Sequence, residues 1–282
     1  MAVLNVTEQS LSGDGIYEPF QNKSTLISAA LSKVESFIRA GCHSVDIGAE
    51  STRPGAEPVA HEDELERVIP VVEAISKNFD IPISIDTTKA IVADEAIKHG
   101  ARIINDVSGL KHDPNMIIVA AQHQCHTIIM HSFTPGIVEK TELGGRYVSS
   151  HVNQNEDVVQ RIITDLNQQI DFAKINGLDT AKIIIDPGIG FGKTVEQNLT
   201  IMDHLHEITA LPYPVLLGAS RKSFIGFTTN TPVEKRLAGS IAALTVGILK
   251  GAKIIRVHDI DESVKAAILV DAILSDKKIS VG

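Results

Sequence analysis

The sequence has only two cysteines, Cys42 and Cys125, which is too few for a disulfide framework. Cys42 lies beside His43, but no second cluster of cysteine and histidine follows at a spacing that would complete a metal site. We therefore expect both cysteines to be reduced and buried as small apolar side chains.

The sequence also lacks an apolar run as long as a membrane-spanning helix, and its N-terminus lacks the basic flank of a signal peptide. Positive charge is in deficit, with 26 Lys and Arg against 35 Asp and Glu and a formal net charge of -9. An acidic balance argues against a surface that follows nucleic acid or an anionic membrane, so any anion site must be a local basic cluster. These absences favour a soluble, cytoplasmic protein with no nucleic-acid or membrane partner.

No linker rich in proline, glycine or serine divides the chain, so we expect residues 1–282 to form one domain. The length allows a large buried core. The chain begins directly on its first predicted strand, which suggests either a minimal form or a domain of a larger polypeptide.

Short apolar segments recur along the chain, and a stretch with helical periodicity follows most of them. The predicted strands are 3–6, 44–47, 82–85, 102–105, 125–130, 182–186, 213–217 and 253–257, and clear helices are expected at 25–39, 62–76, 89–99, 156–175, 196–206 and 233–250. Eight such units predict the α/β class and a (β/α)8 TIM barrel, with the active site at the C-terminal ends of the strands. An open doubly wound sheet is the alternative. The stretch 133–155 shows no regular pattern and is expected to be a functional or mobile loop.

The sixth predicted strand runs directly into Asp-Pro-Gly-Ile-Gly-Phe-Gly-Lys at 186–193. Three isoleucines fit a strand that is covered on both faces. Pro187 removes a backbone donor, and the three glycines permit positive φ or the close approach of a flat ligand. We therefore expect Asp186 to be presented to a ligand as an acceptor for N–H groups. The alternative is an ordinary strand end followed by a turn.

Polar residues follow every predicted strand. In chain order they are Asn5 and Thr7, 51–55 (Ser-Thr-Arg-Pro-Gly), 86–88 (Asp-Thr-Thr), Asn105 and Asp106, His131 and Ser132, Asp186, 218–223 (Gly-Ala-Ser-Arg-Lys-Ser), and 256–259 (Arg-Val-His-Asp). Ser, Thr, Asp and Asn are common helix caps, but Arg, Lys and His are not. The set therefore indicates a functional site. The acidic run 62–64, in contrast, suits the first turn of a helix and needs no site.

Seven segments resemble, in order, the dihydropteroate synthases, the folate-pathway members of the pterin-binding barrel family. They are Leu-Asn-Val-Thr at 4–7, Asp-Ile-Gly-Ala-Glu-Ser-Thr-Arg-Pro-Gly at 46–55, Ser-Ile-Asp-Thr at 84–87, Ile-Asn-Asp-Val-Ser-Gly at 104–109, and the segments at 186–193, 218–223 and 256–259. The resemblance implies a transferase that is a sulfonamide target. It would condense 6-hydroxymethyl-7,8-dihydropterin pyrophosphate with p-aminobenzoate, by an SN1-like mechanism, to 7,8-dihydropteroate and pyrophosphate.

The resemblance also implies a role for individual residues. Asp86, Asn105 and Asp186 would read the polar edge of the pterin, and Lys222 would serve its carbonyl side. Met130 and Phe191 would line the walls. The substrate-binding set further includes Thr52, Gly218, Ser223, Arg256 and His258, with Ser223 near the p-aminobenzoate carboxylate.

The leaving pyrophosphate would be bound by Arg256, His258 and Arg53, because it needs positive charge. Asn5 is the family's position for a side-chain oxygen on Mg2+, a hard ion that prefers oxygen ligands. The catalytic residues implied in this way are Asn5, Arg53, Lys222, Arg256 and His258. The resemblance also implies a homodimer, for which the apolar segment 237–249 is a candidate interface; burial of that segment under neighbouring helices is the alternative.

The first loop departs from the family pattern. Glu8, Gln9 and Leu11 replace a proline, an aspartate and a phenylalanine, and Gly13 and Asp14 appear in transposed order. Ala49 and the segment after the fifth strand also differ. These changes fall on the p-aminobenzoate side, where the first loop normally closes, so pterin pyrophosphate binding is the firmer prediction.

Three interpretations of the first loop follow. They are drift in a working enzyme, altered discrimination between p-aminobenzoate and sulfonamides, and a non-catalytic or altered-specificity pterin-binding paralogue. Phe133 is a candidate replacement for the missing aromatic ring. A methyltetrahydrofolate:corrinoid methyltransferase-like protein is a further alternative, against which Arg256, His258 and the 51–55 loop argue, since that reaction needs no pyrophosphate clamp.

Overall fold

The computed structural model describes residues 1–7, 15–18, 22–50, 59–133, 137–140, 146–149 and 157–275, and parallel strands in them form a closed barrel. Six strands pair in the order β1 (Ala2–Asn5), β2 (Val45–Gly48), β3 (Ile83–Asp86), β4 (Ile103–Asp106), β5 (His126–Met130) and β8 (Ile183–Asp186). β9 (Leu216–Leu217) and β10 (Ile254–Ile255) pair with each other. Parallel bridges from Ile185 to Val215 and from Ala2 to Val257 then join this pair to both edges of the larger sheet. The predicted (β/α)8 barrel is confirmed, and the open sheet is wrong.

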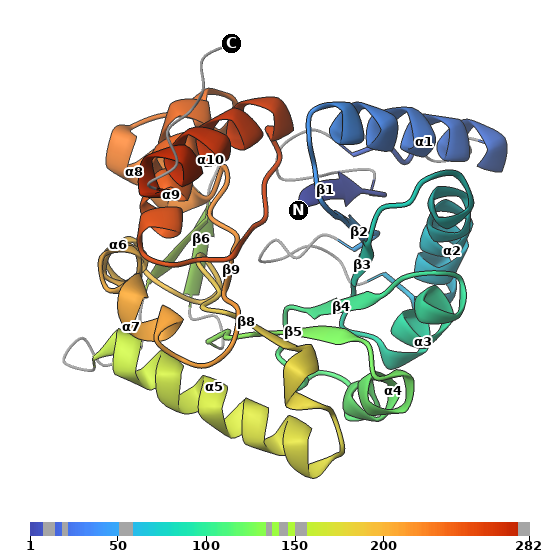
Figure 1. The fold of residues 1–282 in the computed structure, drawn as a ribbon, viewed down its shortest axis with the longest axis horizontal. Helices are drawn as coiled ribbons and strands as arrows, with labels where there is room; N and C mark the ends of the chain where they lie inside the picture. The colour runs from blue at the N-terminus through green and yellow to red at the C-terminus, as the bar shows by residue number, and fades with distance from the viewer. Residues whose placement is uncertain are drawn as a thin grey trace.

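Helices surround the strands in chain order (Figure 1). They are α1 (Lys23–Arg39), α2 (His61–Asn78), α3 (Ala90–Lys98), α4 (Met116–His123), α5 (Val158–Ile175), α6 (Val195–Asp203), α7 (Leu205–Thr209), α8 (Ser223–Thr229), α9 (Leu237–Leu249) and α10 (Ile260–Leu274). Their apolar faces and the outward-facing strand residues make one continuous core. Local chemistry sets several boundaries: Asn22 caps α1, Asp157 caps α5, and Thr194 forms a capping box with Gln197 at α6.

The structure corrects the sequence prediction in the stretch 133–155. This stretch was expected to be irregular, but β6 (Ile137–Lys140) and β7 (Arg146–Ser149) form an antiparallel pair. The predicted helix 196–206 is also interrupted, because α6 ends at Asp203 and α7 begins at Leu205. Cys125 is buried as expected, whereas Cys42 is half-buried; both thiols are free.

The interior of the barrel is layered. Ile128, Ile184 and Leu216, with Met1, Ile103 and Ile254 packed against them, form a separate apolar cluster. Because side chains alternate along a strand, the residue two positions later points to the same interior at the next level. For the six members of the cluster those residues are Val3, Asn105, Met130, Asp186, Gly218 and Arg256. The strand register adds Asn5, Gly48 and Asp86, which lie beside one another and beside Asn105. A polar layer thus lies above the apolar layer, at the C-terminal ends of the strands.

Within the described ranges, no helix is long and apolar enough to cross a membrane.

Candidate active site

Arg256 connects three strands at the centre of the polar layer. Its Nε donates to Asp46 Oδ2 at 2.6 Å, and its Nη2 donates to Asp86 Oδ2 at 2.7 Å. Asn105 Nδ2 donates to the same Asp46 oxygen at 2.9 Å. Asp46 is completely buried, and a buried carboxylate is tolerated only when it is paired and hydrogen-bonded. The network therefore fixes the orientation of Arg256, Asp86 and Asn105 before any ligand binds.

Arg256 is shared between two carboxylates, and it does not fully offset the effect of burial on Asp86. Burial raises the pKa of Asp86 to about 7; Arg256 opposes this rise, while the nearby charge of Asp46 adds to it. For Arg256, burial acts to lower the pKa, but Asp46 and Asp86 outweigh it and the pKa is raised. Arg256 thus stays charged, and Asp86 exchanges its proton near neutral pH.

Asp186 and Lys222 form the second part of the polar layer. Asp186 Oδ1 accepts the N–H of Gly188 at 2.6 Å, and Lys222 donates to the carbonyl of Ile189. The Lys222 ammonium lies 4.2 Å from the centroid of the Phe191 ring, within the range of a cation–π contact. Burial lowers the pKa of Lys222 to about 8, and the Asp186 carboxylate opposes this shift. Burial likewise raises the pKa of Asp186, and Lys222 opposes it.

The loops after β9 and β10 lie against each other. His258 Nδ1 is 3.0 Å from Ser220 Oγ, and Arg221 forms an ion pair with Asp259. Arg221 has a left-handed φ of 57° that is unusual for a side chain of its size. Two side chains hold its backbone. The Arg221 N–H donates to Ser240 Oγ of α9 at 2.9 Å, and Nη1 of Arg236, the residue before α9, donates to the Arg221 carbonyl at 3.0 Å. This clamp sets the position of the next residue, Lys222.

Most residues predicted from the sequence share this end of the barrel. The structure places there Asn5, Asp86, Asn105, Met130, Asp186, Phe191, Gly218, Lys222, Ser223, Arg256 and His258. Met130 is buried and pairs in register with Asp186, and Ser223 is the first residue of α8. Thr52, Arg53 and the divergent first-loop residues Glu8, Gln9, Leu11, Gly13 and Asp14 lie outside the described residues.

Sequence reasoning missed Asp46, Lys193 and the role of Glu64. Asp46 stands at the head of the segment 46–55 and alternates with Gly48, so strand periodicity alone places it inside the barrel. Glu64 belongs to the acidic run that was given no site. Its carboxylate is fully buried and pairs with Lys89 Nζ at 2.6 Å, and Lys89 also pairs with Glu50 at the end of β2. That ion cluster joins Glu50 to α2 and to the residue before α3.

Of the two explanations expected for the glycines of the 186–193 turn, the structure confirms positive φ. Gly188, Gly190 and Gly192 have φ values of 68°, 80° and 65°, which favour glycine. A Cβ at Gly188 would overlap the carbonyl oxygen of His131, and one at Gly192 would overlap the Phe133 carbonyl. The protein's own backbone, packed against the turn, thus already requires glycine at these two positions.

The described residues of the polar layer do not form a closed metal site. Among the described residues, no group of three or more His, Cys, Asp or Glu side chains is arranged to hold one. Asn5 offers a neutral amide in the same register as Gly48 and Asp86. This set fits a Mg2+ ion that keeps several waters and is bound mainly by phosphate oxygens.

Comparison with known proteins agrees with this geometry. Residues 1–258 match the family described as pterin binding enzyme. The dihydropteroate synthase of Bacillus subtilis is 43% identical over 275 residues, covering 98% of this chain and 88% of that one. That of Escherichia coli K12 is 38% identical over 278 residues, covering 99% and 92%.

Solved structures give the same result. A dihydropteroate synthase from Clostridium difficile, crystallised in the presence of pteroic acid, has a TM-score of 0.85 at 38% identity and covers 97% of this chain and 95% of that one. A Yersinia pestis dihydropteroate synthase in complex with a sulfonamide drug has a TM-score of 0.85 at 35% identity, covering 97% and 93%. This chain therefore belongs to the pterin binding enzyme family and, within it, to the dihydropteroate synthases.

Proposed function

We propose that the chain is a transferase of folate biosynthesis that condenses 6-hydroxymethyl-7,8-dihydropterin pyrophosphate with p-aminobenzoate to give 7,8-dihydropteroate and pyrophosphate. The observation that carries this proposal is the preorganised polar layer of Asp86, Asn105, Asp186, Lys222 and Arg256. It lies at the end of the barrel where TIM-barrel enzymes bind substrate, and the similarity to dihydropteroate synthases covers almost the whole chain.

The pterin would bind through its polar edge. Asp186 and Asp86 offer carboxylate oxygens to ring and amino N–H groups, and Lys222, with a pKa of about 8, offers a donor to the carbonyl oxygen. Hydrogen bonds to charged groups are stronger than neutral ones, particularly where water is excluded. Met130 and Phe191 would contact the faces of the ring. Recognition by fixed donors and acceptors requires little rearrangement upon binding, which favours affinity.

The pyrophosphate would leave on the side of Arg256 and His258, with Arg53 from the second loop as a third donor. Positive groups that face the departing oxygens lower the barrier to breaking the C–O bond, because charge develops there. Mg2+, held at Asn5 and by the pyrophosphate, would supply the same neutralisation when bound. The SN1-like route then leaves a pterin methylene cation for the arylamine to attack, and it requires no covalent enzyme intermediate.

The p-aminobenzoate would lie beside Ser223 and the loop that contains Lys222. Phe133, proposed to replace the missing aromatic ring of the first loop, is half-buried and packs edge-on against His131 with ring centroids 4.5 Å apart. Its contact with the arylamine remains a prediction. We also propose that the protein is a homodimer and that sulfonamides compete at the p-aminobenzoate site.

The activity is tested by measuring pyrophosphate release from the pterin pyrophosphate, with Mg2+, in the presence and absence of p-aminobenzoate and of several other aryl amines. We expect release and formation of dihydropteroate with p-aminobenzoate. Pterin binding without release would contradict the enzymatic function and support a non-catalytic paralogue. Turnover with another amine only would support altered specificity. Methyl transfer from methyltetrahydrofolate to a corrinoid, assayed in parallel, should be absent.

A further inference from the structure

Lys193, the last residue of the glycine-rich turn, is buried but binds no carboxylate directly in the part of the chain that the structure describes. Lys193 is only 4% exposed to solvent. The Nζ atom donates to three backbone carbonyls, those of Gly188 at 2.8 Å, His131 at 3.2 Å and Phe191 at 3.2 Å. An ammonium group has three donors and no acceptor, so it matches these three carbonyls one for one. A neutral amine has only two donors and would leave one carbonyl unpaired.

The three carbonyls belong to the two segments that follow β5 and β8, at the C-terminal ends of these paired strands. The His131 N–H donates to the Asp186 carbonyl at 2.9 Å, which continues the strand pairing by one residue. Beyond this point the backbone leaves the sheet, and its carbonyls need other partners. Gly188 and Gly192 allow the turn to pack against residues 131 and 133. Lys193 then joins the turn to the end of β5 at the position where strand hydrogen bonds stop.

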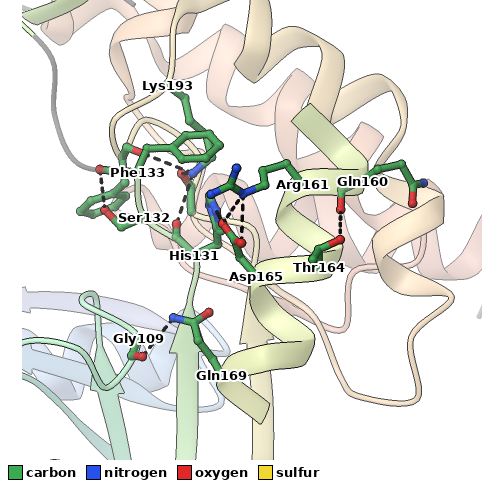
Figure 2. Close-up of polar contacts among 12 residues, drawn as sticks. Gly109, His131, Ser132, Phe133, Gln160, Arg161, Thr164, Asp165, Gln169 and Lys193 are labelled. Atoms are coloured by element: carbon green, nitrogen blue, oxygen red, sulfur yellow. Dashed lines mark hydrogen bonds and ion pairs between the residues drawn. The ribbon is translucent and has the colours of Figure 1, made fainter. Parts of the chain in front are cut away.

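The position of His131 is in turn fixed by α5 (Figure 2). The His131 ring is fully buried, and its Nε2 lies 3.2 Å from Asp165 Oδ2. Arg161 Nε donates to both oxygens of Asp165, at 3.0 and 2.9 Å. Burial, together with the charge of Lys193, lowers the pKa of His131 to about 3, so the ring is neutral. Because the carboxylate of Asp165 is an acceptor, we assign the ring proton to Nε2. A chain of contacts thus leads from the surface of α5 through His131 to Lys193.

Lys193 also acts on Asp186 through its charge. Burial lowers the pKa of Lys193 well below its usual range, and the Asp186 carboxylate opposes this shift most strongly; Lys222 and Lys111 add to it and Asp165 opposes it. For Asp186, burial raises the pKa, while Lys222, the Gly188 N–H, Lys193 and Arg256 lower it. Lys193 and Asp186 each favour the charged form of the other.

We propose that Lys193 is a positioning residue of the pterin site, whose ammonium group pins the turn from Asp186 to Phe191 to the end of β5. The carboxylate of Asp186 and the ring of Phe191 are thereby oriented before the pterin arrives. Lys193 is too buried to touch the ligand, so it acts through the backbone and through its charge. This inference rests on the proposed function of the site.

The test is a Lys193→Met variant, which keeps the length of the side chain and removes its donors and charge. Equilibrium binding of 6-hydroxymethylpterin should weaken by roughly ten- to a hundredfold, because small displacements of binding groups carry penalties of this size. The KM for the pterin pyrophosphate should rise in parallel. Each variant is assayed at several pH values.

The pH profile separates positioning from a merely structural role. If the pterin binds ionised Asp186, binding is lost as pH falls through the pKa of that carboxyl. Without the charge of Lys193 that pKa is higher, so the acid limit of binding should move to higher pH in Lys193→Met. Lost packing alone would weaken binding without moving this limit.

Two controls accompany the variant. Val72→Ala removes buried apolar volume from α2, outside the site, and shows whether lower stability alone weakens binding. Lys174→Met removes an exposed lysine from α5 and should have no effect. If Lys193→Met does not fold, Lys193→Gln, which retains two donors without charge, is used in its place. A folded variant with unchanged pterin affinity and an unchanged acid limit would overturn the inference, whereas absence of pterin binding by the wild type would overturn the proposed function as well.

Discussion

Arg256 illustrates how single residues of the polar layer serve both the fold and the ligand. Its guanidinium pairs with carboxylates from β2 and β3, and the Asp46 carboxylate has no solvent exposure. Removing Arg256 would leave a buried charge unpaired, for which the typical loss of stability is about 3–5 kcal/mol. Loss of activity after substitution at this position would therefore combine a folding effect with a catalytic one. Asp86 is the less buried of the two carboxylates, so a substitution there separates these two effects better.

We predict that Asp86→Asn changes the pH dependence of stability. Burial raises the pKa of Asp86 to about 7. The stability that its protonated carboxyl contributes is therefore fully present below about pH 4 and is lost as pH rises through about 7. Asparagine stays neutral. The stability of the variant relative to the wild type should therefore increase between pH 5 and pH 8, by on the order of 2 kcal/mol, since one pKa unit corresponds to about 1.4 kcal/mol.

Urea unfolding at several pH values would measure this difference. A constant difference across the range would mean that Arg256 keeps Asp86 ionised throughout. Lys265→Met, which removes an exposed lysine of α10, controls for changes in surface charge.

At the residue scale, sequence patterns identified which side chains gather but not how they pair. Strand alternation and the matched segments placed Asp86, Asn105, Asp186 and Arg256 at one end of the barrel, where the structure has them. Asp46 and Lys193 were missed because their partners are remote in sequence: Arg256 for Asp46, and the carbonyl of His131 for Lys193. Their roles depend on distances between strands, which no local pattern contains.

The glycine-rich turn between β8 and α6 is the element whose conformation most directly sets the site. It is fixed at three points. Lys193 binds its carbonyls, Asn198 Oδ1 accepts the Gly190 N–H at 2.7 Å, and Asp186 accepts the Gly188 N–H. Its glycines have left-handed φ angles, which any other residue could adopt only at a cost in free energy. A substitution here should act on the whole turn.

We predict that Gly188→Ala destabilises the protein more than Gly177→Ala. Both glycines have left-handed φ angles, of 68° and 91°, but nothing lies within 4 Å of a Cβ at Gly177, whereas the His131 carbonyl blocks one at Gly188. The conformational cost of alanine is about 1–2 kcal/mol at either position. The overlap adds to it only at Gly188, so we expect a total loss there of at least about 3 kcal/mol. Denaturant unfolding of the two variants compares them, and equal losses would contradict the packing argument.

Other elements show where local pattern is insufficient. The eight barrel strands were predicted because their apolar runs are short and regularly spaced. The pair β6 and β7 was not, although Gly144 and Gly145 precede β7, because its strands lie outside the regular spacing of the barrel strands. The break at His204 was missed because apolar periodicity continues through it into α7. The expectation of a single domain remains a prediction.

The whole molecule exposes apolar side chains on its last two helices. On α9, Val246 and Leu249 are exposed, and on α10 the exposed residues are Ile268, Leu269, Ile273 and Leu274, with Ile273 at 70%. α9 and α10 pack against each other (Figure 1), so these residues belong to adjoining surfaces. Exposed apolar patches of this kind are typical of protein interfaces. Of the two explanations for the apolar segment 237–249, this favours an interface over complete cover by neighbouring helices.

We predict that Ile273→Asp converts a homodimer into monomers. A buried carboxylate without a partner is costly at an interface. In a symmetric dimer the same patch comes from both subunits, so this cost arises twice. Light scattering after gel filtration measures the mass. Ile175→Asp, at an 86% exposed position on α5, is the matched control and should leave the mass unchanged. A wild type that is monomeric at micromolar concentration would contradict the prediction.

The closure of the barrel has a consequence for the order in which the molecule assembles. β1 pairs with β2 on one side, and on its other edge Ala2 is bridged to Val257. Contacts so distant in sequence form slowly, because a very long loop must close before they contribute. The contact of β1 with Val257 therefore closes the longest loop of the barrel, whereas β10 pairs with the nearer strand β9. Arg256 reaches from the end of β10 to Asp46 and Asp86, so the polar layer is complete only when the ring is closed.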